Sequence, residues 1–522
     1  MERIPCENIV LHLLILLASL AFHLVSCAKI TTSLSRHEFP PGFVFGAGSS
    51  AYQIEGAAAE DGRTPSVWDT YAHEGKNMDK STADVTADQY HKYKEDVKLM
   101  HDMGLDAYRF SISWSRLIPG GRGPINPKGL EYYNNLINEL LKYGIDAHVT
   151  LNHFDLPQAL EDEYEGTLSP QITEDFTAYA DVCFREFGDR VKYWITFNEP
   201  NIETVLGRDL GQFPPARCSL RSLCAKGNSS TEPYISAHNI LLSHAAAVQL
   251  YREKYQAAQK GQIGLTILAF WIENQTDSAR DIAAAQRARD FHLGWFLDPL
   301  MYGDYPAVMR KNVGSRLPSF RPDESEQLKG SFDFIGLNHY TVMYMKDVTG
   351  SSDTYGSAYF ADISATIAFP GLPRLFRENQ LGIKGTLMPA APWALQQLLE
   401  YVKLNYQNIA VMIHENGYGE LNLNSTNDAD EGIDDTERTD YLEAYIKSML
   451  PSIRDGSNIK GYFVWSMLDS FELIFGYTSH FGLYHIDFSG QDRQRQPRQS
   501  AHWYTNFLKN SGRGGSRNSD SI

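Results

Sequence analysis

Short apolar runs alternate with longer amphipathic segments along most of the chain. Eight apolar runs have the length of β-strands, at residues 43–47, 107–113, 147–151, 193–198, 263–269, 332–337, 411–415 and 462–465. Segments with apolar residues at helical spacing lie between or after them, at residues 86–103, 129–143, 173–187, 233–255, 281–295, 393–405, 436–450 and 500–508. Strands that each precede a helix predict βα units in a parallel sheet. Because eight such strands close a barrel, we predict an α/β fold with a single (β/α)8 TIM barrel.

An open, doubly wound sheet is the alternative fold, but the phosphate-binding pattern G-x-G-x-x-G is absent. The run GAGSS at residues 46–50 is not followed by the lysine of a phosphate loop, so we attribute its glycines to a tight turn. Residues 207–231 and 343–389 lack clear periodicity and are predicted to be loops. In a barrel, long loops gather at the C-terminal face, where they shape the substrate entrance.

The composition excludes several classes of function. The net charge is −17 and no lysine or arginine cluster occurs, which argues against a nucleic-acid partner. With 43% hydrophobic residues the chain can bury a large core without the help of a metal. No histidine-rich metal site is visible, and we predict no metal ligands.

The N-terminal segment differs from the rest of the chain. Residues 9–25 are almost wholly apolar and are followed by Ser26, Cys27 and Ala28. Small residues there fit a signal peptide, residues 1–28, cut after Ala28, and a retained signal anchor is the alternative. We therefore expect a catalytic domain at residues 29–510, a disordered tail at 511–522, and a secretory-pathway protein of the apoplast or vacuole, free of the membrane after signal removal.

Cysteines and sequons agree with an oxidising compartment. Cys218 and Cys224 bracket a short loop and are predicted to form a disulfide, while Cys183 lies in an apolar helical pattern as a buried thiol. Zinc binding is the alternative, but no histidine or second cysteine pair is near in sequence. Three sequons lie in polar stretches and are predicted glycosylation sites, at Asn228, Asn274 and Asn424.

Two glutamates follow predicted strands, Glu199 after the fourth and Glu415 after the seventh. Barrels expose catalytic groups at such strand ends, and a lone buried charge there is costly. The alternative is that both are ordinary strand-end residues. Paired carboxylates can cleave a glycosidic bond: at about 5–5.5 Å apart one attacks the anomeric carbon and the other protonates the leaving oxygen, with retained configuration.

From about residue 39 to 508 the chain resembles glycoside hydrolase family 1, and within it the plant β-glucosidases. The motifs that carry the resemblance are FPPGFVFGAGSSAYQIEGA, AYRFSISWSRL, HFDLPQAL, TFNEP, DFIGLNHY, HENGYG, WSMLDSFE and GYTSHFGLYHIDF. The resemblance implies a (β/α)8 barrel, retaining stereochemistry and no cofactor. It also implies that Glu199 is the acid/base and Glu415 the nucleophile.

The resemblance further implies roles for residues around the two glutamates. Arg109 and Tyr340 would orient the nucleophile and keep it ionised. Trp393 would form the aromatic platform for the aglycone. The remaining matches are positions that bind the nonreducing sugar or form its pocket, with Tyr340 again among them: Gln53, His153, Asn198, Asn338, Tyr340, Trp465, Glu472 and Phe481.

The chain departs from the family pattern at two positions. Most members read F-E-W where this chain has Phe471-Glu472-Leu473, so one indole donor is missing near the sugar. His414 replaces the more frequent threonine before the nucleophile. With these departures, the NEPNIE context and the GNSSTEPYI segment, the chain resembles a plant branch that contains transglucosidases. Such enzymes pass glucose from an ester or glycoside donor to phenolic acids, flavonoids or hormones.

Three hypotheses follow for the function. The first is a retaining β-glucosidase that hydrolyses small-molecule plant glucosides. The second is a transglucosidase with a phenolic acceptor, whose pocket would include Phe270, Trp271 and Trp393. The third is a carbohydrate-binding protein without catalysis.

Overall fold

The computed structural model describes residues 34–350, 357–367, 386, 388–421 and 433–509. The predicted signal peptide 1–28, the predicted tail 511–522 and the sequon at Asn424 lie outside these residues. Within the described part of the chain, no helix has both the length and the apolar character needed to span a bilayer.

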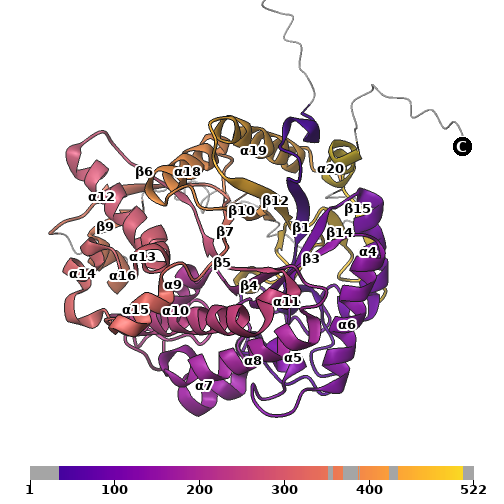
Figure 1. Ribbon diagram of the computed structural model, residues 1–522, viewed down its shortest axis with the longest axis horizontal. Helices are drawn as coiled ribbons and strands as arrows, with labels where there is room; N and C mark the ends of the chain where they lie inside the picture. Colours follow the sequence, from indigo (N-terminus) through magenta and orange to yellow (C-terminus); the bar gives the residue numbers. More distant parts are fainter. Residues whose placement is uncertain (1–33, 351–356, 368–385, 387, 422–432, 510–522) are drawn as a thin grey trace, which may run out of the picture.

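Eight parallel strands close into a barrel at the centre of the molecule (Figure 1). Each strand pairs with its neighbours along the chain, and β1 pairs with β12 to close the ring. Every predicted strand overlaps one of them, and the TIM-barrel prediction is confirmed. The barrel strands are β1 (Val44–Gly48), β2 (Ala107–Ser111), β3 (Asp146–Asn152), β4 (Tyr193–Asn198), β5 (Gln262–Leu268), β7 (Phe334–Asn338), β10 (Val411–Asn416) and β12 (Ile459–Trp465).

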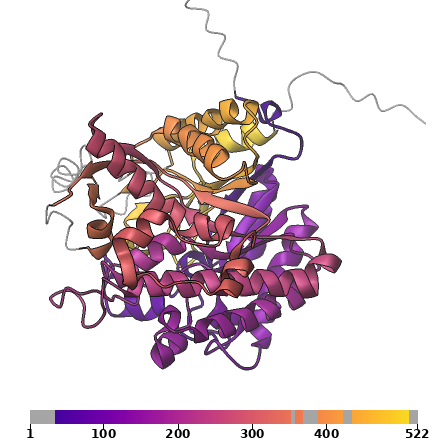
Figure 2. The ribbon, with the colours of Figure 1, turned by 60° about the vertical axis from the view of Figure 1, so that its left-hand side comes forward.

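Helices cover the outside of the barrel between successive strands. Asn126 shows how one of them starts: its side chain accepts a hydrogen bond from the Lys128 N–H, and Pro127 occupies the first helical turn. Figure 2 shows two of the helices, α18 and α19, packed beside one another over the strands. The long helices are α4 (Gln89–Met103), α6 (Pro127–Lys142), α8 (Gln171–Phe187), α10 (Glu232–Tyr251), α12 (Ala279–Arg289), α13 (Trp295–Tyr302), α18 (Pro392–Asn405), α19 (Thr436–Arg454) and α20 (Gln499–Lys509).

The prediction that residues 343–389 form a loop is wrong in part. β8 (Val342–Asp347) pairs with β6 (Trp271–Asn274) and β9 (Ala365–Ile367) in a small sheet outside the barrel, and α16 (Ala358–Ile363) lies between β8 and β9. β8 shows no regular alternation of apolar and polar residues, and β6 and β9 have only four and three residues, so no periodic pattern reveals them. Arg287 holds the sheet through Asp347 and the carbonyl of Ile363.

Residues 209–231 form the predicted loop, between α9 (Pro200–Arg208) and α10. Cys218 and Cys224 are joined there by a disulfide, and Cys183 is a buried free thiol, so both cysteine predictions are confirmed. Asn228 is exposed and Asn274 is partly exposed, while glycosylation at either stays a prediction.

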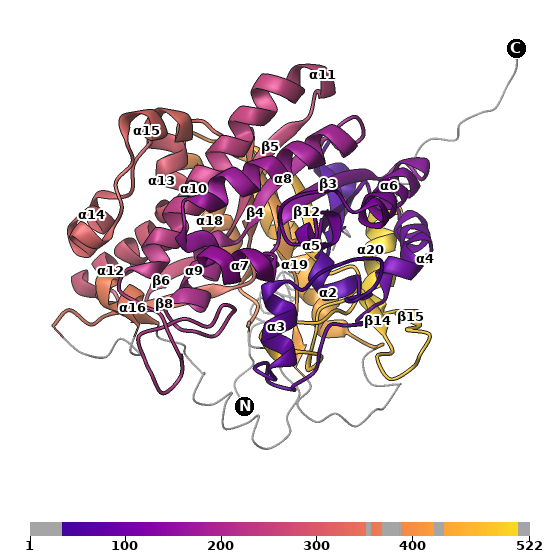
Figure 3. The same ribbon diagram turned by 90° about the horizontal axis from the view of Figure 1, so that it is seen from below.

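Glycines on the inner face of the barrel make room for large side chains. A Cβ on Gly46 would lie 2.5 Å from the Phe463 ring, and one on Gly48 would lie 3.3 Å from the Trp465 ring. Large and small residues thus alternate around the barrel axis and fill its interior. At the C-terminal face, α3 (Val67–His73) and α9 lie toward the lower edge of Figure 3, whereas α11 (Ala257–Gln259), which precedes β5, lies at the opposite end. The C-terminal face of the barrel is therefore covered by the loops that follow the strands.

Candidate active site

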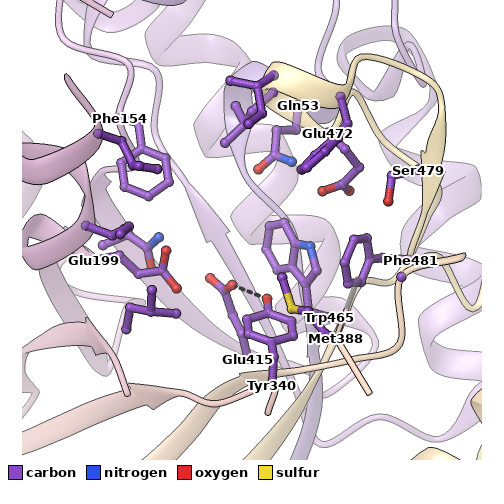
Figure 4. A pocket seen from close by; sticks show the side chains of 18 of the residues that line it. Gln53, Phe154, Glu199, Tyr340, Met388, Glu415, Trp465, Glu472, Ser479 and Phe481 are labelled. Carbon is purple, nitrogen blue, oxygen red and sulfur yellow. Dashed lines mark hydrogen bonds between the residues drawn. The ribbon is translucent and has the colours of Figure 1, made fainter. Parts of the chain in front are cut away.

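A cavity of about 280 Å³ opens at the carboxyl ends of the barrel strands. Figure 4 shows the carboxyl groups of Glu199 and Glu415 facing one another across it. Glu199 follows β4 and Glu415 lies in β10, and β5 and β7 lie between these two strands in the barrel. Ten of the predicted residues line the cavity, namely Gln53, His153, Asn198, Glu199, Phe270, Tyr340, Glu415, Trp465, Glu472 and Phe481.

Glu199 is held in an uncommon backbone conformation between β4 and α9. Its φ of 45° lies in the left-handed region, which a non-glycine residue adopts at an energetic cost of about 1–3 kcal/mol. Its N–H donates to the Thr266 carbonyl at 2.8 Å, and the following Pro200 begins α9. The Asn338 amide donates to its Oε1 at 2.8 Å. These contacts aim the carboxyl group into the cavity.

The electrostatic surroundings favour the protonated form of Glu199. Burial and, secondly, the neighbouring Glu415 charge raise the pKa of Glu199 to about 8, against the opposing effects of the Asn338 hydrogen bond and the Arg109 charge. At neutral pH this carboxyl group therefore carries a proton that it can donate.

Glu415 has the surroundings of an ionised carboxylate. The Arg109 guanidinium donates from Nη1 to its Oε1 at 2.5 Å, and the Tyr340 hydroxyl donates to its Oε2 at 2.7 Å. Arg109 is fully buried, and its charge is balanced by this carboxylate. A register shift of β10 after Ile413 brings Glu415 level with Asn338 on β7. The two acids thus differ in their partners: Glu415 accepts from the Arg109 guanidinium, whereas Glu199 accepts from the Asn338 amide.

Asn198 connects both carboxyl groups to the sugar side of the cavity. Its Oδ1 accepts from Arg109 Nη2 at 2.5 Å and from Asn338 Nδ2 at 3.1 Å. Its amide nitrogen lies 3.0 Å from His153 Nε2. Burial and the Arg109 charge lower the pKa of His153 well below its usual value, so the ring is neutral and Nε2 accepts.

The far end of the cavity carries polar groups beside a flat indole. Gln53, Glu472 and Trp465 meet there, with Trp465 between the other two and Glu415 (Figure 4). Ser470 donates to Glu472 Oε1 at 2.7 Å, and burial raises the pKa of Glu472 to about 8. Amide, carboxyl and aromatic groups together can bind the vicinal hydroxyls and the face of a pyranose ring. Ser479, which the sequence reasoning missed, also lines this end.

The outer wall of the cavity is almost wholly apolar. It comes from the loop after β3, from α9, from the loop after β5, and from the turn at Leu473–Phe475. No motif marks these residues as a group, because they are ordinary apolar side chains far apart in the sequence. The main members are Phe154, Ile202, Leu206, Phe213, Leu268, Phe270, Met388, Ile474 and Phe475.

Two predicted aromatic residues lie away from the cavity. Trp393 is at the second position of α18 and 44% exposed, and it does not line the wall, which Thr386 and Met388 form instead. The proline before it starts the helix, so the indole projects from the first turn. Trp271 packs against Tyr401 and the Arg289 guanidinium in the outer sheet. The aglycone platform at Trp393 therefore stays a prediction.

Known proteins are similar to this chain in sequence and in fold. The profile of glycosyl hydrolase family 1 matches residues 35–513. Beta-glucosidase 22 of Oryza sativa subsp. japonica is 54% identical over 488 residues, 93% of this chain and 90% of the relative. A cyanidin 3-O-glucoside 7-O-glucosyltransferase (acyl-glucose) of Delphinium grandiflorum is 51% identical over 512 residues, 97% of each chain.

A solved structure of a rice β-glucosidase, a glutamate-to-glutamine mutant in a covalent complex with glucose, superposes with a TM-score of 0.86. It is 46% identical in sequence, and the match covers 91% of this chain and 100% of that one. The barrel, the paired glutamates and these similarities lead to one conclusion. The chain belongs to glycosyl hydrolase family 1.

Proposed function

We propose that this protein is a retaining β-glucosidase that hydrolyses terminal nonreducing β-D-glucosyl residues of plant glucosides through a covalent glucosyl-enzyme. The observation that carries the proposal is the pairing of Glu415, bound by Arg109 and Tyr340, with the buried and proton-bearing Glu199. The relatives named as β-glucosidases support it. A protein that only binds carbohydrate has no need of two such differently tuned carboxyl groups.

In the first step, a Glu415 oxygen attacks the anomeric carbon while Glu199 gives its proton to the glycosidic oxygen. The bond to the aglycone breaks, its electron pair stays on that oxygen, and the neutral aglycone leaves. Asn198, at the junction of the two acids, is placed to bind the sugar 2-hydroxyl, where a hydrogen bond strengthens in the transition state.

In the second step, Glu199 accepts a proton from water, and the water oxygen attacks the anomeric carbon. Glu415 leaves as a carboxylate and returns to Arg109. While it is an ester, Glu415 carries no charge, so the repulsion that helped to raise the pKa of Glu199 is absent. Glu199 is therefore tuned as an acid in one step and as a base in the next.

Activity on substrates with poor leaving groups is expected to fall as the pH rises through about 8, the pKa of Glu199. Above that value the carboxyl group has lost the proton that the leaving oxygen needs. This alkaline fall, or limb, is measured in the pH profile of kcat/KM for an alkyl β-glucoside. A dinitrophenyl glucoside, whose leaving group needs no proton, serves as the control and should lack the limb; equal alkaline limbs would contradict the assignment.

Leu473→Trp is expected to raise kcat/KM for simple aryl glucosides about 3- to 10-fold, because one added hydrogen bond contributes about 0.5–1.5 kcal/mol. Leu473 lines the cavity beside Glu472, where an indole would add a donor. Leu473→Phe is the matched control, since it adds ring area without the donor. If both variants gained equally, wall area rather than hydrogen bonding would explain the effect.

A transglucosidase is the second candidate function, and the apolar outer wall favours it. Phe154, Phe213 and Phe270 can bind an aromatic acceptor and hold its hydroxyl near the glucosyl-enzyme in place of water. One relative that resembles this chain is named as an acyl-glucose-dependent glucosyltransferase.

One experiment separates the candidates. The protein is incubated with an aryl β-glucoside or an acyl-glucose, with and without a phenolic acceptor, and the products are identified by mass. Glucose as the main product in both incubations supports the hydrolase, whereas a glucosylated acceptor in excess over glucose supports the transglucosidase. Donor that stays intact would refute both.

We also propose that residues 1–28 are a signal peptide and that the mature chain resides in the apoplast or vacuole. The Cys218–Cys224 disulfide supports this location, because such bonds persist in oxidising compartments. N-terminal sequencing of the protein isolated from plant cells should begin at Lys29. A protein that retained residues 1–28 would contradict the proposal.

A further inference from the structure

Directly beneath the nucleophile, the barrel interior contains a layer of buried polar side chains. Arg109 on β2, His148 on β3, Thr266 on β5 and His414 on β10 have no exposed surface. Arg109 and His148 are partners in the register of β2 and β3, and His414 directly precedes Glu415. The centroids of the His148 and His414 rings lie 6.2 Å apart. The mechanism derived above uses only Arg109 from this layer.

Several atoms of the layer have no hydrogen-bond partner within the described protein. They are Arg109 Nε, His414 Nε2 and both ring nitrogens of His148. A buried polar atom without a partner is costly, and in folded proteins such atoms are nearly always paired with protein or with ordered water. Four unpaired atoms on three neighbouring side chains are therefore the mark of internal hydration.

The charge state of the histidines fits hydration better than a direct contact with the guanidinium. Burial and then the Arg109 charge lower the pKa of His148 to about 3, and the same two causes lower the pKa of His414 well below its usual value. Both rings are neutral, so each carries one N–H donor and one acceptor nitrogen. Water both accepts from Arg109 Nε and donates to an imidazole nitrogen, which suits this set.

His414 is fixed in place by a contact on its other side. Its Nδ1 lies 2.7 Å from the Thr266 hydroxyl, so Nε2 faces away from β5. A Cβ at Gly336 would lie 2.3 Å from this Nδ1 and 2.2 Å from Thr266 Oγ1, so the contact depends on a glycine at that position. A threonine at position 414, the more frequent residue in the family, has no side-chain nitrogen and would leave the layer without the His414 imidazole.

We propose that ordered water in the barrel interior joins Arg109 Nε to His414 Nε2 and His148, and that His414 thereby acts as a positioning residue for the Arg109–Glu415 pair. Two of the three guanidinium nitrogens of Arg109 already donate hydrogen bonds, Nη1 to Glu415 and Nη2 to Asn198. A hydrogen bond from Nε to water gives the third nitrogen a partner and fixes the plane of the guanidinium group. This inference rests on the proposed function, because Glu415 must act as the nucleophile for its orientation to matter.

Two variants of His414 test the positioning role. His414→Phe keeps a ring of similar size but removes both nitrogens, and it should lower kcat about 10- to 100-fold, because misplacement of a catalytic group costs up to about 100-fold. KM should stay within about threefold, since the sugar contacts are untouched. His414→Gln, which keeps a polar group near the Nε2 position, should recover most of the activity.

A merely structural role would give a different pattern. His414→Phe would then change the melting temperature alone, while kcat and KM stayed as in the wild type, and the proposal would be overturned. Equal losses in His414→Phe and His414→Gln would also overturn it, because the polar group would be irrelevant.

A crystal structure of the wild-type protein tests the hydration without any variant. Ordered water should lie within hydrogen-bonding distance, about 2.7–3.2 Å, of both Arg109 Nε and His414 Nε2. A dry barrel interior would refute the proposal even if the variants failed to fold. A wild-type protein without glucosidase activity would refute the proposed function and the positioning role with it, while the water positions would still decide the hydration.

Discussion

Glu415→Ala is expected to lower kcat on every β-glucoside by roughly 10⁴- to 10⁶-fold, the scale seen when an essential nucleophile is removed from other enzymes. No other described residue at the cavity combines a carboxylate with an Arg109 contact, so nothing replaces the lost bond to the anomeric carbon. Steady-state kinetics with an aryl β-glucoside measures the loss.

A small external anion such as azide provides a sharper test of the same variant. It can enter the space vacated by the carboxylate and attack the anomeric carbon from that side, which yields an α-glucosyl product from a β-glucoside. NMR distinguishes the anomers. A β-configured azide product would contradict Glu415 as the residue on that face of the sugar.

Glu415→Gln is the matched control for stability. Removing the carboxylate leaves Arg109 buried with an uncompensated charge, and breaking such a pair costs about 3–5 kcal/mol. Glu415→Gln loses the same negative charge, but the glutamine keeps an oxygen for the guanidinium and fills the same volume, so it should melt at a higher temperature than Glu415→Ala. If Glu415→Gln were the more stable variant and yet as inactive as Glu415→Ala, the loss of activity would be chemical rather than structural.

Glu199→Gln is expected to separate substrates by their leaving groups. For alkyl glucosides, turnover should fall about 10²- to 10⁴-fold, the usual contribution of general acid catalysis. For dinitrophenyl glucosides, the first step should be nearly unaffected, because the leaving oxygen needs no proton. Without a general base the second step is slow, so the covalent glucosyl-enzyme should accumulate. Intact-protein mass spectrometry should detect the added glucosyl group on the variant.

Glu203→Gln provides the control for Glu199→Gln. Glu203 lies one turn further along α9, and burial raises its pKa to about 7, yet it does not line the cavity. Turnover of both substrate types should match the wild type in this variant. A similar leaving-group dependence in both variants would mean that the charge of α9, and not a proton on Glu199, governs the first step.

The barrel could be predicted because its strands are buried on both faces and read as apolar runs. β4 and β10 end in TFN and in IHEN, so the change from apolar to polar letters marked the places of Glu199 and Glu415. In the outer sheet, β8 alternates little and β9 has three residues, so no periodicity was available there. Such strands form because short segments that lie far apart in the sequence pair with one another, and the sequence of either segment alone does not predict this pairing.

The site was predictable to the extent that its chemistry is carried by rare side chains in fixed motifs. Arg109, Tyr340 and Asn338 fall where the resemblance implies and make the contacts that orient the acids. Apart from Phe270, the apolar wall escaped prediction, because Phe154 and Phe475 look like any core residues until the loops that follow β3 and β12 come together at the cavity. Trp393 is exposed in the first turn of α18 and is absent from the cavity lining, so its role as a platform stays a prediction.

The division of labour between strands and loops has a consequence for how this protein can change over time. Bond-breaking groups are anchored in β4 and β10, while the surface that meets the departing molecule belongs to α9, to the Leu473–Phe475 turn and to the segment around Met388. Substitutions in those loops can alter which molecule is released or accepted without disturbing the glutamates. Related proteins with this arrangement can therefore change the molecule from which glucose is removed, or to which it is passed, through single substitutions that keep the catalyst active.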